Sequence, residues 1–108
     1  MKLTNLCNIN AKEVVQGYFG KFINSQNMSM AIWEVKADSP LPEHKHINEQ
    51  ITMILKGKFK MIVDGKTQIL ESGSVIIIPS NVPHSGLSIT DCKIIDAFHP
   101  VREDFKNK

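Results

Sequence analysis

The feature that most constrains the fold of this chain is a series of short apolar runs separated by turn residues. The run "MSMAIWEVKA" (28–37) has the length and mixed alternation of a strand. The segment "EQITMILKGKFKMIVDGKTQILES" (49–72) predicts three strands, with a hairpin at Asp64-Gly65. Two further strands are predicted within "GSVIIIP" (73–79) and "CKIIDAFHP" (92–100). Many short strands with frequent turns are typical of an all-β sandwich or barrel.

The two ends of the chain carry weaker signals. The segment "NAKEVVQG" (10–17) is a weak candidate for a short helix, and "VREDFKNK" (101–108) is expected either to form one helical turn or to fray. A length of 108 residues fits one domain, which we expect to span 1–108. That length can bury a hydrophobic core without disulfides or a structural metal.

Charge, hydropathy and cysteine usage indicate which partners and which cellular location to expect. The formal net charge is +2, and the alternation of Lys56, Lys58 and Lys60 indicates one solvated strand face rather than a nucleic-acid patch. The chain has no 18-residue apolar run and no signal-peptide pattern, so we expect no membrane partner. Its two cysteines, Cys7 and Cys92, form no CxxC motif, which favours reduced thiols and a cytoplasmic location.

Three histidines and one glutamine form a candidate metal site. His44 and His46 share a face if they lie on one strand, and Gln50 has the same parity. His84 ends a separate strand-turn unit. Taken alone, a His-x-His pair fits a polar surface patch equally well. Three imidazoles with one amide oxygen would instead suit one divalent transition metal and leave coordination positions open.

The spacing of these residues resembles the two motifs of the cupin family. The first motif is present as His44, His46, Gln50 and Gly57, with six residues between the last two. The second motif is present as Gly73, Pro79, Asn81 and His84. Asp38 and Asn81 stand where the family usually has glycine, and Ser88 replaces a terminal asparagine. Asparagine tolerates the left-handed turn that the motif requires. The resemblance implies a cupin-type jelly-roll β-barrel with a motif core of about 28–105.

A carboxylate lies inside the last predicted strand. Asp96 shares its parity with Ile94 and Phe98, and Arg102 follows the bend at Pro100. A buried carboxylate is costly unless it is paired, hydrogen-bonded or functional. Two interpretations have equal weight on spacing alone. Asp96 and Arg102 form a structural ion pair that closes the barrel, or both serve a substrate.

The segment from 28 to 105 is similar to the small cupins of pectin and alginate breakdown, which convert 4,5-unsaturated monouronates into open-chain keto sugars. The resemblance implies a metal-dependent isomerase that acts on a carboxylated sugar. The implied metal ligands are His44, His46, Gln50 and His84, for one divalent Ni, Mn, Fe, Zn or Co ion. The implied substrate residues are Asp96, Phe98 and Arg102.

Other residues and other functions stay open at this point. His99 and Glu49 have parities that point outward, and Asn48 stands where the family often has a further histidine. The alternatives in function are a metal-dependent cupin dioxygenase and a sugar-acid-binding or sensor module without turnover. Small cupins commonly pair through an apolar outer strand face, so we expect a homodimer. We expect its partner to be a small molecule and not a nucleic acid.

Overall fold

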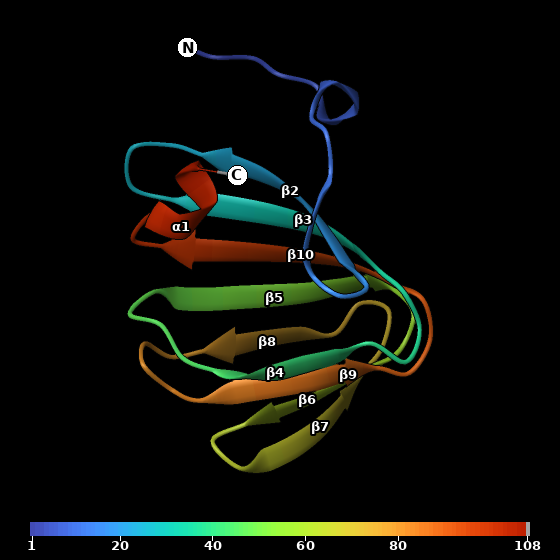
Figure 1. Cartoon of the computed structure of the whole chain (residues 1–108). Helices are drawn as coiled ribbons and strands as arrows, with labels where there is room; N and C mark the ends of the chain where they lie inside the picture. The colour runs from blue at the N-terminus through green and yellow to red at the C-terminus, as the bar shows by residue number, and fades with distance from the viewer. Residues whose placement is uncertain (108) are drawn as a thin grey trace.

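The structure is a computed structural model that describes residues 1–107, and it consists mainly of β-strands (Figure 1). The elements in chain order are η1 (Leu6–Asn8), β1 (Lys12–Val15), β2 (Tyr18–Asn24), β3 (Ser29–Val35), β4 (Pro40–His44), β5 (Glu49–Lys56), β6 (Phe59–Val63), β7 (Lys66–Leu70), β8 (Val75–Ile78), β9 (His84–Ser88), β10 (Cys92–His99) and α1 (Glu103–Lys106). Among residues 1–107, no helix is long and apolar enough to cross a membrane.

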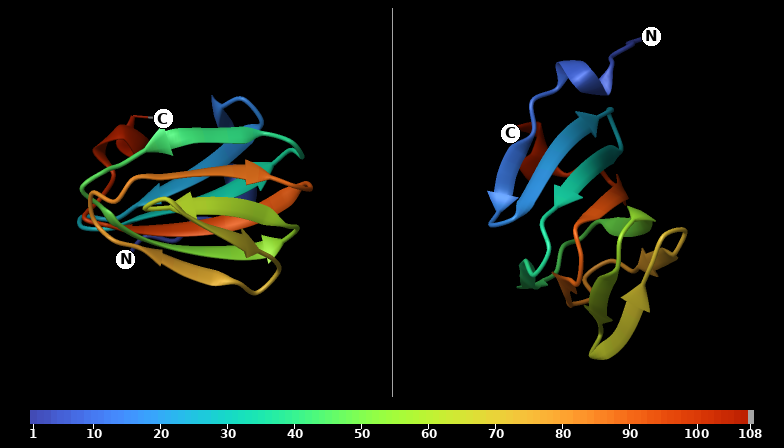
Figure 2. Two further views of the ribbon diagram at one scale, coloured as in Figure 1. Left: turned by 90° about the horizontal axis from the view of Figure 1, so that it is seen from below. Right: turned by 90° about the vertical axis from the view of Figure 1, so that its right-hand side faces the viewer.

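Two antiparallel sheets face each other and enclose the core (Figures 1 and 2). The larger sheet has the order β1-β2-β3-β10-β5-β8, and the smaller has the order β4-β9-β6-β7. The last strand, β10, lies between β3 and β5, so the two ends of the chain meet within one sheet. This arrangement confirms the prediction of an all-β jelly-roll barrel.

Local turn signals predicted several elements correctly. Val63 pairs with Lys66 across the hairpin between β6 and β7, and both turn residues have positive φ, 51° at Asp64 and 75° at Gly65. That geometry matches the right-handed twist of the flanking strands. Asn81 has φ of 61°, which confirms that asparagine holds the left-handed turn in place of glycine. The helical turn predicted at the C-terminal end is present as α1.

The helix predicted near the start of the chain is wrong. Residues 12–15 form β1, in which Lys12 pairs with Gly20 and Glu13 with Phe19 on β2. Two consecutive valines, Val14 and Val15, restrict side-chain rotation in a helix and suit a strand. Pairing with β2 therefore overrides the weak helical pattern.

The histidine-rich stretch does not lie on one strand, which corrects the prediction from parity. His44 ends β4 in the smaller sheet, whereas Gln50 is the second residue of β5 in the larger sheet. His46 lies in the loop between them. His84 begins β9, a strand that was not predicted, and it pairs with His44 across β4 and β9.

The core occupies the space between the sheets. Ile54 and Ile78 from the larger sheet and Phe59 from the smaller sheet are almost fully buried. Along β10 the inward residues Ile94 and Phe98 are buried, as their parity predicts. At the end of the barrel where β10 stops, α1 covers the larger sheet (Figure 1).

Candidate metal centre

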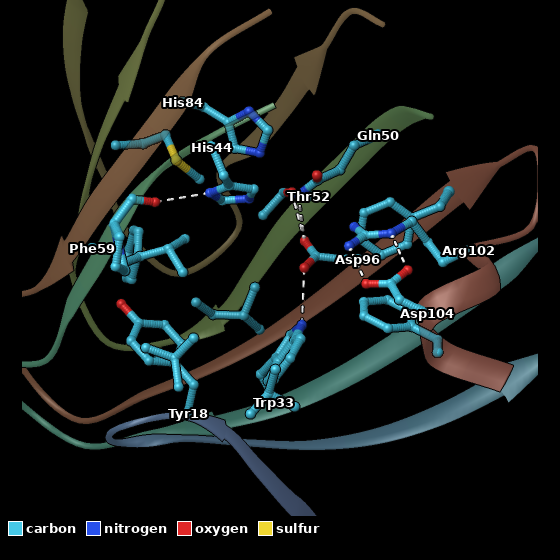
Figure 3. A pocket seen from close by; sticks show the side chains of 18 residues that line it. Tyr18, Trp33, His44, Gln50, Thr52, Phe59, His84, Asp96, Arg102 and Asp104 are labelled. Carbon is cyan, nitrogen blue, oxygen red and sulfur yellow. Dashed lines mark hydrogen bonds and ion pairs between the residues drawn. The ribbon is translucent and has the colours of Figure 1, made fainter. Parts of the chain in front are cut away.

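A cavity of about 240 Å³ lies between the two sheets (Figure 3). Its apolar lining residues include Tyr18, Leu41, Phe59, Met61 and Ile94. Its polar lining residues include His44, Gln50, Thr52, His84, Asp96 and Arg102. The cavity thus combines titratable groups with side chains that exclude water.

Three imidazoles meet beside this cavity, and two of them, those of His44 and His84, line it. One ring nitrogen from each of His44, His46 and His84 lies within 4.8 Å of the others. The ring centres of His44 and His84 are 4.2 Å apart, and those of His46 and His84 are 5.1 Å apart. The smaller sheet and the β4–β5 loop thus bring together the three histidines that the sequence singled out.

Backbone carbonyls fix the tautomer of each imidazole. The Nδ1–H of His44 donates to the carbonyl of Pro42 at 2.8 Å, and that of His46 donates to Asn48 at 2.9 Å. The Nδ1–H of His84 donates to Val82 at 2.9 Å. Because a carbonyl oxygen only accepts, each Nδ1 carries the proton and each Nε2 keeps a free lone pair.

The Nε2 atom of His84 is buried and has no hydrogen-bond partner among the described residues. A buried polar nitrogen without a hydrogen-bond partner costs free energy, and in a native structure it indicates that another group or ion binds there. A cation bound at this nitrogen would remove that cost.

Gln50 adds an oxygen to the cluster. Its Nε2 donates to Thr52 Oγ1 at 2.8 Å and to Asp96 Oδ1 at 3.2 Å, which turns its Oε1 toward His46. That Oε1 lies 3.1 Å from His46 Nε2. Both atoms are acceptors when Nδ1 of His46 holds the proton, so they repel each other without a cation. A spacing of about 3 Å suits two neighbouring ligands of one ion with bonds of about 2.1 Å.

Burial favours the neutral form of two of these imidazoles, those of His46 and His84. Desolvation lowers the pKa of His84 to about 4, and the hydrogen bond to Val82 opposes that shift only in part. Desolvation and the charge of Arg102 lower the pKa of His46. Neutral imidazole is the form that binds a metal. The donor set of three imidazole nitrogens and one amide oxygen therefore fits a transition metal.

Asp96 lies next to this donor set, and it is 8% exposed. Its Oδ2 accepts the indole N–H of Trp33 at 2.9 Å, and its Oδ1 accepts from Thr52 at 2.6 Å. Burial raises the pKa of Asp96 above the ordinary value, and the hydrogen bonds from Thr52, Trp33 and Gln50 oppose that rise. The carboxyl group is thus joined through Gln50 to the histidine cluster.

Arg102 does not pair with Asp96, so the structural ion pair considered from the sequence is not formed between these residues. Its guanidinium instead donates from Nε to Asp104 Oδ1 at 3.0 Å and from Nη2 to Oδ2 at 2.8 Å. Its Cζ lies 4.9 Å from the ring centre of Phe98 and 4.3 Å from that of Phe105. The arginine lines the cavity with its carbon stem and plane held against aromatic rings (Figure 3).

The sequence did not single out three residues that shape the site. Thr52 has the parity of Gln50 on β5, so alternation gave a usable signal. Trp33 bonds Asp96 from 63 positions away, and no local pattern reveals that contact. Asp104 pairs with Arg102 from a helical turn that the sequence predicted only in outline. His99 and Glu49 are exposed, as their parity predicts.

The family follows from comparison with known proteins. A family model described as the cupin domain matches residues 31–98. The chain is a cupin. Cupin folds generally bind a transition metal, which agrees with the donor set of this cupin.

Two relatives show how this cupin compares in sequence. The pectin degradation protein KdgF of Dickeya dadantii is 34% identical over 64 residues, which cover 57% of this chain and 58% of that protein. The chain therefore spans less than two thirds of the length of that relative. An uncharacterized protein of Streptomyces coelicolor is 24% identical over 102 residues, covering 93% of this chain and 97% of that protein.

Solved structures share the cupin fold. An RmlC-like cupin from Shewanella frigidimarina superposes with a TM-score of 0.91 at 22% identity, covering 97% of this chain and 96% of that chain. KdgF from a Halomonas species superposes with a TM-score of 0.89 at 20% identity, covering 96% and 97%. At these identities the likeness concerns the fold.

Proposed function

We propose that this cupin binds one divalent transition metal and converts a 4,5-unsaturated uronate to its open-chain keto form. The metal ligands in this proposal are His44, His46, Gln50 and His84. The residues that serve the substrate are Asp96, Phe98 and Arg102. The observation that carries the proposal is the meeting of a metal donor set, a buried carboxyl group and an arginine in one cavity. The sequence similarity to a pectin degradation protein supports the substrate class.

The reaction is an isomerisation, in which protons are transferred and the substrate and product have the same composition. Ring opening breaks the bond between the anomeric carbon and the ring oxygen, takes a proton from the anomeric hydroxyl to form an aldehyde, and gives a proton to the ring oxygen, which becomes an enol. Ketonisation then removes the enol proton and adds a proton at the neighbouring carbon. A bound metal would supply positive charge that stabilises the negative charge developing on substrate oxygen. The protein must supply a group that accepts and returns protons.

Asp96 has the environment of such a group. Its raised pKa brings the carboxyl closer to the pH at which it can both take and give a proton. Thr52 and Trp33 hold its two oxygens in fixed directions. Arg102 is available to a carboxylate in the same cavity, and Phe98 forms part of the wall that limits water. These roles together give the isomerisation a proton carrier and an anchor.

The test is ketonisation of an unsaturated galacturonate monomer by metal-loaded protein, followed by the loss of alkene absorbance and by NMR of the product. Asp96→Asn should lower turnover by about 100- to 10,000-fold while the metal stays bound. The introduced amide can keep its oxygen toward Thr52 and Gln50, which leaves the ligand orientation intact and only the Trp33 N–H without an acceptor. Normal turnover in a metal-loaded Asp96→Asn protein would refute the role of Asp96.

Glu49→Gln is the matched control, because Glu49 is an exposed carboxylate on the same strand as Gln50. This change should leave turnover and metal content unaltered. Dioxygen uptake without ketonisation would favour the dioxygenase alternative instead. Tight binding of the uronate with no product for any of the candidate metals would favour a binding module.

A further inference from the structure

We infer that Asp104 is a positioning residue that fixes the edge of Arg102 presented to the cavity, so that a carboxylate is bound end-on by the two Nη atoms. The inference deepens the proposed function and rests on it for the substrate class. It concerns a residue outside the metal donor set, on the helical turn α1.

A guanidinium can grip a carboxylate along either of two edges. One edge offers Nε with Nη2, and the other offers Nη1 with Nη2. Asp104 occupies the first edge, with Nε–Oδ1 of 3.0 Å and Nη2–Oδ2 of 2.8 Å. Three N–H donors remain, and two of them, one on each Nη, point along the second edge. A substrate carboxylate can therefore bind Arg102 bidentately without displacing Asp104.

The second edge belongs to a largely buried side chain that lines the cavity. The side chain of Arg102 is 14% exposed, whereas that of Asp104 is 54% exposed, so the aspartate lies on the solvent side. Figure 3 shows the guanidinium reaching toward Asp96 with Asp104 beside it.

Other contacts hold the side chain of Arg102 in place. The Cζ atom lies over Phe98 and Phe105, and the backbone N–H of Arg102 donates to Ser29 Oγ at 2.8 Å. The rings hold the guanidinium against their faces, and Asp104 fixes its rotation about the remaining bond. Without Asp104, the guanidinium of Arg102 would keep its position, but neither of its two edges would be held toward the cavity.

The opposite role for Asp104 is that of a competitor that a substrate must displace, and the two roles predict opposite results. Loss of a competitor tightens carboxylate binding, whereas loss of a positioning residue weakens it. The free edge of Arg102 favours positioning, because no displacement is needed. A carboxylate held end-on also has both oxygens in the guanidinium plane, which limits the rotation of the bound sugar acid.

The experiment uses zinc-loaded protein, with D-galacturonate as an unreactive carboxylate probe and D-galactose as its uncharged counterpart. Arg102 is the only arginine in the sequence, so its guanidinium N–H signals in ¹⁵N NMR are assigned without ambiguity. In Asp104→Asn we expect the Kd of galacturonate to rise about tenfold, with galactose binding and zinc affinity unchanged. With unsaturated uronate, KM should rise by the same factor, and kcat should change by less than about threefold in either direction. Asp104→Glu should restore part of the affinity.

Glu103→Gln is the control, because Glu103 is exposed on the same helical turn and pairs with Lys106. Equal or tighter galacturonate binding in Asp104→Asn would overturn the inference. If galacturonate fails to bind but acetate shifts the Arg102 signals in the parent protein and less so in the variant, the inference stands and the uronate function fails. If neither carboxylate shifts the Arg102 signals, the inference is overturned.

Discussion

The hydrogen bond between Trp33 and Asp96 allows the ionisation of Asp96, the proposed proton carrier, to be measured. Trp33 is the only tryptophan in the sequence, and its indole N–H donates to Asp96 Oδ2 at 2.9 Å. Its ¹⁵N–¹H signal should therefore follow the ionisation of Asp96. Burial raises the pKa of Asp96, so the inflection in a pH titration should lie above the ordinary value of 3.8. An inflection at or below that value would contradict the assignment.

The same shift has a defined effect on stability. Because the pKa of Asp96 is higher in the folded state than in the unfolded state, the folded state binds more protons above pH 3.8. The contribution of this group is complete below pH 3.8 and is lost as pH rises through the folded pKa. Comparison of urea unfolding for the parent and Asp96→Asn across this range isolates that contribution.

Alternation along strands explains which residues the sequence identified. Asp96 and Phe98 on β10 point inward because side chains alternate, and this rule needs no knowledge of the partner strand. The contacts of Trp33 and Asp104 depend on which strands and turns become neighbours. That information is distributed over the whole chain, so their roles became visible only in the structure.

At the scale of elements, Asn48 joins the β4–β5 loop, which carries His46, to the segment that carries Arg102. It is 4% exposed, and its side-chain amide donates to the carbonyls of Pro100 and Val101. Its own carbonyl accepts the Nδ1–H of His46. The β4–β5 loop and the chain after β10 are thus held together by one residue.

Asn48→Ala should release this connection. We expect the free energy of unfolding to fall by about 1–3 kcal/mol, because two carbonyls lose a donor in a buried place. KM for the uronate should rise more than the zinc Kd, since the backbone contact to His46 remains. Urea unfolding, KM and zinc titration measure these three effects. Asn27→Ala, in an exposed turn, is the control, and matching results for both variants would refute the connection.

The division of the histidine stretch between two sheets is the main feature of the elements that the sequence did not predict. His44, His46 and Gln50 come together although they do not share a strand and His46 lies in a loop, so strand parity is not the reason for their grouping. Which sheet a strand joins depends on long-range pairing, as when β4 pairs with β9 and β5 pairs with β10. Motif spacing succeeded here because it reflects the final fold rather than local conformation.

At the scale of the whole molecule, the metal should not be needed for folding. The buried core around Ile54, Phe59 and Ile78 lies between the sheets and involves no ligand side chain. Chelation should leave the far-UV circular dichroism spectrum unchanged and lower the Tm only by the loss of binding energy. Replacing both His44 and His46 with alanine should give a folded protein without metal. Cooperative loss of β structure on chelation would show a structural metal instead.

The outer face of the larger sheet carries an apolar band that supports the expected homodimer. Strand register aligns Ile23 with Met30, Met30 with Ala97, Ala97 with Ile51, and Ile51 with Ile77 across five strands. Met30, Ile51 and Ile77 are 42%, 47% and 63% exposed. An exposed apolar band of this kind is typical of an interface. We propose that two copies of the chain pack through it.

Analytical ultracentrifugation tests this pairing. The parent protein should sediment as a dimer, and the double variant Ile51→Lys with Ile77→Lys should sediment as a monomer, since buried lysines would lack partners. Ile69→Lys, on β7 of the smaller sheet, should leave the dimer intact. A parent protein that stays monomeric at high micromolar concentration would refute the proposal.

Each imidazole of the metal cluster takes its tautomer from a carbonyl only two residues away, at Pro42, Asn48 and Val82. The ligating form of each histidine is therefore encoded in a tripeptide, and the barrel contributes only the relative placement of three such units. A circular permutant opened at the exposed Asp64-Gly65 turn should consequently retain its affinity for zinc. By the same reasoning, these tripeptides can be transferred. A different β scaffold that holds them at the same separations should present histidines whose Nε2 atoms are free to bind a metal.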